Sequence, residues 1–253
     1  MTNKLIYFIG NWKMFGDFSS IKIINKLNKF YSKFKKIHYK NKIILCVPYT
    51  LIHFFKEKNK TKHIYFGAQD CHQHQTNGPF TGSISASMIK KVGAQYVILG
   101  HSENRSSGDT NHKIKDKIKS ALNQKLRIIF CIGETFKERK EKKTISVLRK
   151  QIKGSIDKKY NLNKIIIAYE PVWSIGTGKI PKIQELKKIF KYIKSEFKKN
   201  FKTSTFPVVI YGGSVNGKNI HKFSSIPEID GFLIGGASQS SKKFIDIIRN
   251  YYK

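Results

Sequence analysis

Residues 95–133 read QYVILGHSENRSSGDTNHKIKDKIKSALNQKLRIIFCIG, and they contain the repeating unit of this chain. Two short runs in it, QYVILG (95–100) and RIIFCIG (127–133), are almost continuously apolar, which is typical of strands covered on both faces. Between them, NHKIKDKIKSALN (111–123) repeats apolar residues at spacings of three and four, which predicts an amphipathic helix. The stretch therefore predicts a strand–helix–strand unit.

The same alternation continues in both directions along the chain. Further strand-like runs are LIYFIG (5–10), KIILCV (42–47), HIYFG (63–67), KIIIAY (164–169), FPVVIYG (206–212) and DGFLIGG (230–236). Further helical patterns are IKIINKLNKFYSKF (21–34), IQELKKIFKYIKSEF (183–197) and KKFIDIIRNYY (242–252). Eight strands that alternate with Lys-rich amphipathic segments predict a parallel sheet with right-handed crossovers.

Eight such units in 253 residues, with no linker or shift in composition, predict an α/β protein with a single-domain (β/α)8 barrel over residues 1–253. An open doubly wound sheet is the alternative. It would need a glycine-rich dinucleotide fingerprint after the first strand, and GNWKMFGD (10–17) lacks one. The closed barrel is therefore the favoured architecture.

The charge balance is strongly basic, with 49 Lys and Arg against 16 Asp and Glu and a net charge of +33. Clustered cations would indicate nucleic-acid binding. Here the lysines are spread over every expected helix, which is more typical of solvated faces. We keep a non-catalytic phosphate- or nucleic-acid-binding barrel as the alternative function, and expect the positive field to speed the arrival of anionic ligands.

The cysteines and the apolar runs indicate a soluble cytoplasmic protein. No apolar run approaches the ~18 residues of a membrane helix, and the N-terminus does not resemble a signal peptide. Cys46 and Cys131 lie inside strand-like runs, where a thiol acts as a small hydrophobe. Cys71 follows Asp70 in a polar stretch, so we expect it to be more exposed. No CxxC spacing indicates a redox or metal role.

Several chemically reactive side chains follow strands of the expected barrel. They are Asn11 and Lys13 after the first strand, His101 and Glu103 after the fourth, and Glu170 after the sixth. A lone histidine or glutamate in such a place is more often structural. In a barrel, however, the carboxyl ends of all strands meet at one rim, where catalytic groups lie. Together these residues predict an acid–base site there.

Two glycine pairs at the last two strands predict a phosphate site. They lie in YGGSV (211–215) and IGGAS (234–238). Glycine allows the backbone to approach a ligand closely, and backbone N–H groups near a helix start bind anions. Barrel phosphate sites usually follow strands seven and eight.

Six segments together resemble the signature segments of the triosephosphate isomerase family, in the same order and spacing and over nearly the whole chain. They are NWKM (11–14), GHSE (100–103), CIGE (131–134), AYEPVWSIGTGK (168–179), YGGSV (211–215) and GFLIGGAS (231–238). The resemblance implies interconversion of dihydroxyacetone phosphate and D-glyceraldehyde 3-phosphate, a step of glycolysis and gluconeogenesis. It also implies that no cofactor or metal takes part.

The resemblance also implies a role for each residue of the rim. Glu170 would move the proton between neighbouring carbons, and His101 would polarise the carbonyl oxygens as a neutral imidazole. Lys13 would supply positive charge, Asn11 would orient it, and Glu103 would pair with it. The substrate would also contact Asn11 and Lys13, with its phosphate held by backbone N–H groups of Gly176, Ser214, Gly235 and Gly236.

Residues 171–179 would form a lid over this site. By resemblance, the lid and its supports comprise Pro171, Val172, Trp173, Ile175, Thr177, Gly178, Lys179, Tyr211 and Leu233. Ile175 and Leu233 would press on Glu170 when the lid shuts, and Trp173 would be anchored near Tyr169 and Glu134. A shut lid excludes water, which strengthens the charge interactions inside.

The loop 68–82, AQDCHQHQTNGPFTG, resembles the family's interdigitating loop. The resemblance implies a homodimer in which Thr76 reaches towards Asn11 and Lys13 of the neighbouring subunit. His72 and His74 in this loop could instead indicate a metal site. We favour an exposed loop, because no cluster of metal-ligand residues accompanies them.

Four positions depart from the family pattern. Asn104 replaces an Arg in GHSENR, Ser83 replaces a Glu after TG, and Gln239 replaces a packing residue after GGAS. The fourth is Pro181, which falls where a backbone N–H would meet the Tyr211 hydroxyl in the shut lid. Proline has no N–H, so we expect that hydrogen bond to be missing and closure to depend more on the Gly178 N–H.

Overall fold

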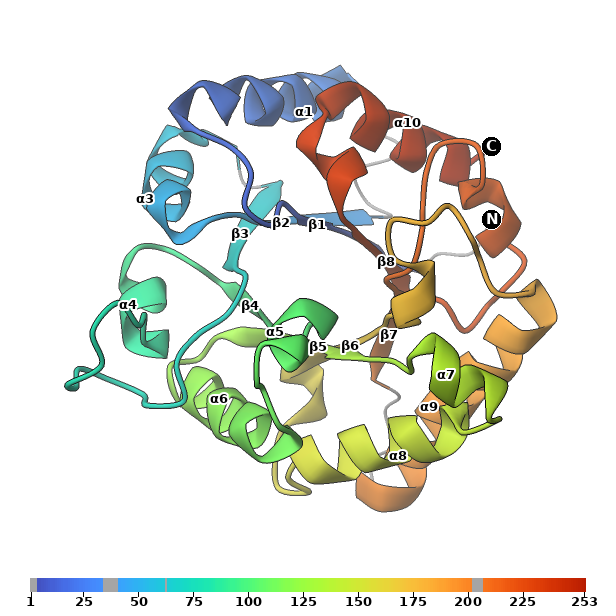
Figure 1. The fold of residues 1–253 in the computed structure, drawn as a ribbon. Helices are drawn as coiled ribbons and strands as arrows, with labels where there is room; N and C mark the ends of the chain where they lie inside the picture. Colours follow the sequence, from blue (N-terminus) through green and yellow to red (C-terminus); the bar gives the residue numbers. More distant parts are fainter. Residues whose placement is uncertain (1–3, 34–40, 62, 202–206) are drawn as a thin grey trace.

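The computed structural model describes residues 4–33, 41–61, 63–201 and 207–253, and its eight parallel strands form one closed barrel (Figure 1). Each strand pairs with the next along the chain, and Tyr7 of the first strand aligns with Gly231 of the last. The strands are β1 (Ile6–Asn11), β2 (Asn41–Cys46), β3 (Ile64–Ala68), β4 (Tyr96–Leu99), β5 (Arg127–Ile132), β6 (Ile165–Tyr169), β7 (Val208–Tyr211) and β8 (Gly231–Ile234). The predicted (β/α)8 architecture is confirmed.

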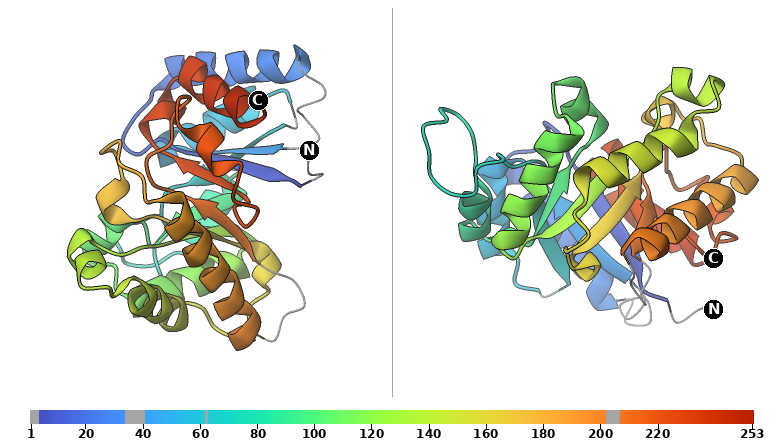
Figure 2. Two further views of the ribbon diagram at one scale, coloured as in Figure 1. Left: turned by 90° about the vertical axis from the view of Figure 1, so that its right-hand side faces the viewer. Right: turned by 90° about the horizontal axis from the view of Figure 1, so that it is seen from below.

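Helices surround the strands on every side (Figure 1, Figure 2). They are α1 (Ile21–Lys33), α3 (Tyr49–Lys58), α4 (Ala86–Lys91), α5 (Ser102–Ser106), α6 (Asn111–Asn123), α7 (Phe136–Lys140), α8 (Thr144–Ser155), α9 (Ile183–Phe201) and α10 (Ser241–Tyr251). The alternation is less regular than predicted between β7 and β8, because the described connection there holds only the 3₁₀ turn η4 (Ile220–Phe223). Within the described ranges, no helix is both long and apolar enough to cross a membrane.

Local sequence signals explain where several helices begin. The Thr110 side chain accepts a hydrogen bond from the third residue of α6, and Ser240 does the same for α10. Thr135 and Glu138 form a reciprocal capping box at the start of α7. These side chains satisfy backbone N–H groups that have no partner within the helix. Strand limits differ from the predicted ones by a residue or two, and residue 206 of the seventh lies outside the described ranges.

The strands divide the apolar side chains between two cores because successive residues point to opposite faces. In β1, Phe8 belongs to the outer core beneath the helices, while Tyr7 and Ile9 belong to the core inside the barrel. Every β strand is thus covered on both faces, as the continuous apolar runs indicated. Cys46 and Cys131 lie in the inner core, as expected for structural thiols.

The prediction that Cys71 is more exposed than the other cysteines is wrong. The exposed fraction of Cys71 is only 2%. The neighbouring Asp70 carboxylate accepts two hydrogen bonds from Lys117 Nζ at 2.8 and 2.9 Å, and this pairing folds the start of the loop against α6. Burial raises the pKa of the Cys71 thiol to about 12, so it stays protonated near neutral pH.

Candidate active site

The predicted catalytic side chains meet at the carboxyl end of the barrel. Asn11 ends β1, His101 follows β4 and Glu170 follows β6, and all three are buried. His101 Nε2 lies 3.6 Å from Glu170 Oε1, and Lys13 Nζ lies 2.5 Å from Glu103 Oε1. One imidazole, two carboxylates, one ammonium and one amide therefore share the same rim.

Glu170 is a buried carboxylate that the protein leaves short of partners. Its exposed fraction is 3%, and its Oε2 atom has no hydrogen-bond partner among the described residues. Burial raises the pKa of Glu170 above its ordinary value, while His101, the Cys131 thiol and Lys13 oppose part of that shift. A carboxylate with a raised pKa is a stronger base, so Glu170 is suited to accept a proton.

Two glycines make the slot that holds Glu170. A Cβ atom at Gly133 would lie 1.8 Å from the Glu170 carbonyl oxygen, and one at Gly212 would lie 2.5 Å from Glu170 Cγ. Both distances are far below van der Waals contact, so a side chain at residue 133 would displace the backbone of Glu170 and one at residue 212 would displace its side chain. The glycines of CIGE and YGGSV thus have a packing role beside the base as well as any role in a phosphate site.

His101 has its ring orientation set by the start of a helix. It is the N-cap residue of α5, and its Nδ1 atom accepts a hydrogen bond from the Glu103 N–H at 3.3 Å. In a neutral imidazole one nitrogen accepts and the other donates. The Nε2–H group is therefore the donor, and Nε2 lies 3.6 Å from Glu170 Oε1.

Lys13 has an unusual backbone conformation. Its φ angle is +55°, which is uncommon for a residue other than glycine, and such strain often accompanies function. Its N–H donates to Asn11 Oδ1 at 3.2 Å, so the Asn11 side chain holds this turn. Burial acts to raise the pKa of Glu103, but Lys13 and His101 outweigh it and lower that pKa. The predicted Lys13–Glu103 pair is present.

Gln239, which follows β8, supports the turn that contains Lys13 after the neighbouring strand β1. Its Nε2 group donates to the Trp12 carbonyl oxygen at 2.8 Å. The sequence alone predicts only the loss of a packing side chain at residue 239. The amide instead joins the turn η5 (Gly236–Gln239) after β8 to the backbone next to Lys13.

The glycines assigned to the phosphate lie around the same opening. Gly176 and Gly178 have φ angles of +70° and +77°, which non-glycine residues rarely adopt. Gly235 precedes and Gly236 begins the turn η5, where first-turn N–H groups lack intrahelical acceptors. A Cβ atom at Gly235 would come within 4.0 Å of Lys13 Cε, so this turn adjoins the ammonium chain.

The predicted lid is anchored at its first end. Trp173 Nε1 donates to Glu134 Oε1 at 3.1 Å, and the Tyr169 hydroxyl donates to Glu134 Oε2 at 3.0 Å. The Arg139 guanidinium also stacks over the Trp173 ring at 4.5 Å. Pro171 is buried, Val172, Thr177 and Lys179 are exposed, and Ile175 is half-buried, while Leu233 lies in the core inside the barrel.

Ser174 is the residue of this region that sequence reasoning missed. Its hydroxyl lies 3.0 Å from the Tyr211 hydroxyl, donates to the Lys179 carbonyl oxygen at 2.6 Å and accepts from the Ser214 N–H at 3.2 Å. The only signal for it was a hydroxyl between Trp173 and Ile175 in an otherwise apolar stretch. Tyr211 therefore has a partner that does not depend on Pro181.

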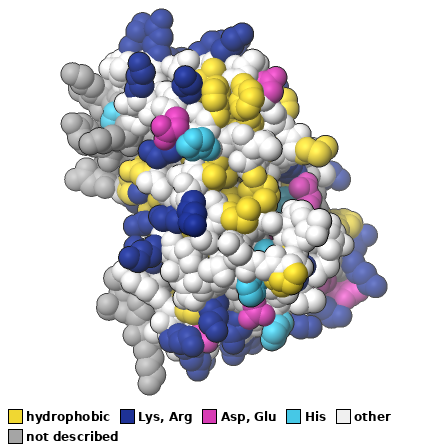
Figure 3. Space-filling model, turned by 90° about the vertical axis from the view of Figure 1, so that its left-hand side faces the viewer, with side chains coloured by type: hydrophobic (Ala, Val, Ile, Leu, Met, Phe, Trp, Pro, Cys, Tyr) yellow, Lys and Arg dark blue, Asp and Glu magenta, His cyan; other side chains and the backbone are white. Residues whose placement is uncertain are grey.

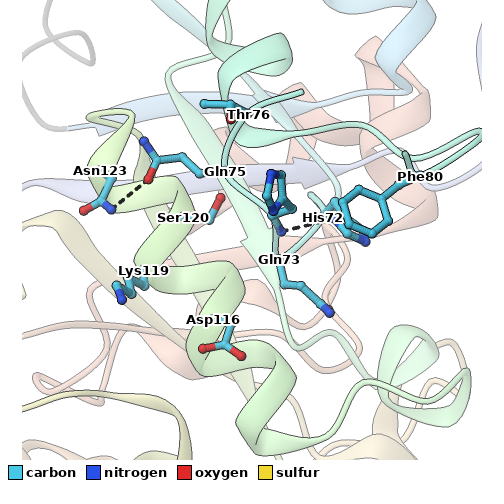
Figure 4. A pocket seen from close by; sticks show the side chains of 10 residues that line it. His72, Gln73, Gln75, Thr76, Phe80, Asp116, Lys119, Ser120 and Asn123 are labelled. Carbon is cyan, nitrogen blue, oxygen red and sulfur yellow. Dashed lines mark hydrogen bonds between the residues drawn. The ribbon is translucent and has the colours of Figure 1, made fainter. Parts of the chain in front are cut away.

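Thr76 is the residue predicted to reach the rim of a neighbouring subunit. The loop between β3 and α4 stands out from the barrel (Figure 1, Figure 2), and Thr76 is exposed on it. Together with residues of α6 it lines a surface cavity of about 550 Å³, where Asn123 Nδ2 donates to Gln75 Oε1 at 2.9 Å (Figure 4). His72 and His74 pack on the Phe80 ring at 4.4 and 5.3 Å.

The fold and the rim define a (β/α)8-barrel protein with a buried carboxylate base facing an imidazole. A family model described as triosephosphate isomerase matches residues 6–251, and the chain belongs to the triosephosphate isomerase family. It is 38% identical to a triosephosphate isomerase of Yarrowia lipolytica, over 95% of this chain and 96% of that protein. It is also 38% identical to one of Dictyoglomus thermophilum, over 99% and 100%. A crystal structure of triosephosphate isomerase from Bartonella henselae superposes with a TM-score of 0.88 at 32% identity, covering 98% of this chain and 99% of that one.

Proposed function

We propose that this protein, acting as one barrel domain, interconverts dihydroxyacetone phosphate and D-glyceraldehyde 3-phosphate. The observation that carries the proposal is the buried Glu170 carboxylate, with its Oε1 atom 3.6 Å from His101 Nε2. An aldose–ketose isomerisation needs one base and one electrophile around two neighbouring carbons. Membership of the family supports the triose phosphate as substrate.

The proton transfer follows from the two groups. Glu170 removes a proton from the carbon beside the carbonyl, which leaves an enediolate and a neutral carboxylic acid. The acid then returns this proton to the neighbouring carbon, while the hydroxyl proton passes from one oxygen of the enediolate to the other. The reaction therefore needs no net proton and no electron acceptor. The His101 Nε2–H group donates to the oxygen on which negative charge develops, and Lys13 adds positive charge nearby.

The phosphate group occupies the opening bounded by the lid and the two glycine-rich turns. Backbone N–H groups of Gly176, Ser214, Gly235 and Gly236 hold it, because N–H groups in tight turns bind anions without needing side chains. The phosphate also draws the lid inward over Glu170. Ile175 and Leu233 then exclude water from the carboxylate, which strengthens the charge interactions on the enediolate.

The active form is a homodimer. Large apolar side chains that this chain leaves exposed support it, and they include Met14, Phe15, Phe18, Tyr49, Phe80 and Met88. The face that carries α3 and α4 shows patches of such side chains (Figure 3). Contiguous exposed apolar surface of this kind marks protein interfaces. In the dimer the Thr76 loop completes the neighbouring site next to Asn11 and Lys13.

The alternative of a non-catalytic basic binding protein gains no support. Lys and Arg are scattered over the face in Figure 3 and do not form the continuous stripe that a nucleic-acid backbone requires. A decayed enzyme would also have no reason to keep a buried base without a partner. We assign the protein to the cytoplasm, where its three buried free thiols match a reducing compartment.

The test is isomerisation of D-glyceraldehyde 3-phosphate in a coupled assay, with wild type beside Glu170→Gln. We expect fast wild-type turnover and a loss of about 10²- to 10⁴-fold in kcat for the variant, the usual contribution of a positioned acid–base group. Glu138→Gln, on the exposed capping box of α7, is the matched control and should retain full activity. An inactive wild type that is folded and dimeric would refute the proposal.

A further inference from the structure

Ser174 lies at the last position of the 3₁₀ turn η3 (Val172–Ser174), inside the lid segment, and it is fully buried. Its hydroxyl contacts three groups from three places. These are the Lys179 carbonyl at the far end of the lid, the Tyr211 hydroxyl at the end of β7, and the Ser214 N–H in the loop that follows β7. One oxygen atom therefore joins both ends of the lid to the loop after β7.

The three contacts use the whole hydrogen-bonding capacity of the hydroxyl. A serine hydroxyl has one proton to donate and two lone pairs. The Lys179 carbonyl can only accept, so it takes the single proton at 2.6 Å. The lone pairs then accept from the Ser214 N–H and from the Tyr211 hydroxyl, which fixes Tyr211 as a donor.

The cluster is closely packed. A Cβ atom added at Gly213 would lie 2.2 Å from the Tyr211 hydroxyl oxygen and 2.6 Å from Ser174 Oγ. The glycine of YGGSV that follows Gly212 is therefore needed for the two hydroxyls to meet. Pro181 offers no N–H to Tyr211, and Ser174 supplies the contact that Tyr211 makes instead.

The third contact conflicts with the proposed phosphate site. The Ser214 N–H is one of the groups assigned above to the phosphate, yet here it points to Ser174 Oγ at 3.2 Å. A phosphate oxygen and the Ser174 hydroxyl would compete for the same N–H group. Binding of the phosphate therefore requires the hydroxyl to move away, and the lid residue that carries it moves too.

We propose that Ser174 is a positioning residue whose hydroxyl holds the lid in the observed conformation by occupying the Ser214 N–H until a phosphate displaces it. This inference rests on the proposed function, since it needs Ser214 to contact the phosphate. The Ser174 hydroxyl is hydrogen-bonded to Lys179, Tyr211 and Ser214, so it acts through the lid and the loop after β7. Removal of the Ser174 hydroxyl makes the phosphate bind more tightly, because the hydroxyl no longer competes with the phosphate for the Ser214 N–H.

The test measures the affinity of the dimeric protein for inorganic phosphate by titration calorimetry, together with KM and kcat of isomerisation. Ser174→Ala should lower the phosphate Kd by about two- to tenfold, the range of one net hydrogen bond. KM should fall in the same direction and by more than kcat changes. Ser174→Cys keeps the side-chain volume but offers sulfur, a weak acceptor, so it should change the Kd in the same direction if alanine impairs folding.

Ser146→Ala is the matched control, because that hydroxyl donates to the Lys143 carbonyl at 2.8 Å on the distant helix α8. Its phosphate Kd should equal that of wild type. A folded Ser174→Ala or Ser174→Cys protein with an unchanged or weaker phosphate Kd would overturn the inference while wild-type turnover upholds the proposed function. A wild type without turnover would overturn the proposed function and, with it, the inference about Ser174.

Discussion

Two buried charged clusters in this barrel differ in how many of their charged atoms have hydrogen-bond or ion-pair partners. Lys117 is only 3% exposed, and its Nζ lies 2.8 Å from Asp70 Oδ2 and 2.7 Å from Asp109 Oδ2. Asp109 also pairs with Lys113 at 3.1 Å. At the rim, by contrast, Glu170 has an imidazole at 3.6 Å and a buried oxygen without a partner among the described residues.

The difference separates a structural cluster from a site prepared for a ligand. A buried ion pair that is fully hydrogen-bonded holds two elements together, here the loop after β3 and helix α6. A buried carboxylate that lacks partners costs stability. In the proposed function, the missing partner of Glu170 is the substrate. Breaking the Lys117 cluster should therefore lower the free energy of unfolding, whereas neutralising Glu170 should raise it.

The largest expected effect comes from breaking the satisfied cluster with Lys117→Met. This change leaves Asp70 and Asp109 facing each other without the shared ammonium group, and it should lower the free energy of unfolding by about 3–5 kcal/mol. Urea denaturation measures it. Lys113→Met is the matched control, because that partly exposed partner should contribute no more than about 1 kcal/mol. Equal losses in the two variants would contradict the assignment.

Glu170→Gln should change stability in the opposite direction, although it removes the proposed base. It removes a charge that is buried without sufficient partners, so the free energy of unfolding at pH 7 should rise by roughly 1 kcal/mol. The same denaturation series detects this change. A destabilised variant would mean that the Glu170 carboxylate is satisfied after all, and the comparison of the two clusters would fail.

The pH dependence follows from the raised pKa of Glu170. The base works when ionised, so kcat/KM should fall as the pH drops through a value above the ordinary 4.5 of a glutamate. Between 4.5 and that raised pKa the folded state binds more protons than the unfolded state. Folding stability should therefore decrease as the pH rises through this window. Glu170→Gln should lack this slope, and an identical slope in both proteins would exclude Glu170 as its source.

The smallest effect concerns the support of the rim. Gln239→Met keeps the length of the side chain but removes the hydrogen bond to the Trp12 carbonyl, worth about 0.5–1.5 kcal/mol. The strained Lys13 turn then loses one restraint, and kcat/KM should fall by up to about tenfold. Steady-state kinetics measure it. Unchanged kinetics would show that Asn11 alone is sufficient to hold this turn.

The sequence predicted the barrel and the rim well because both have periodic or local signals. Apolar runs at regular spacing indicated eight strands, and the topology of a barrel then brings Asn11, His101 and Glu170 to one end. The glycines after β7 and β8 were visible as well. No contact between distant loops was needed for any of these predictions.

The features that were missed depend on contacts between loops. Ser174 meets Ser214 forty residues later, and Gln239 meets Trp12 across the closure of the barrel. Asp70 and Lys117 are separated by 47 positions, and their pairing holds the residues around the buried Cys71 against α6. A polar residue in a loop carries no period, so its partner cannot be inferred until the loops are placed.

The slot made by Gly133 and Gly212 has a consequence for redesign of this barrel. Residue 170 fills the space beside both glycines, so neither position has room for a side chain. The base could therefore be replaced by another residue type, but it could not easily be moved to another position. Laboratory evolution towards another proton transfer would therefore have to move the substrate relative to the base. We expect selected substitutions to gather in the phosphate turns and the lid, and to avoid these two glycines.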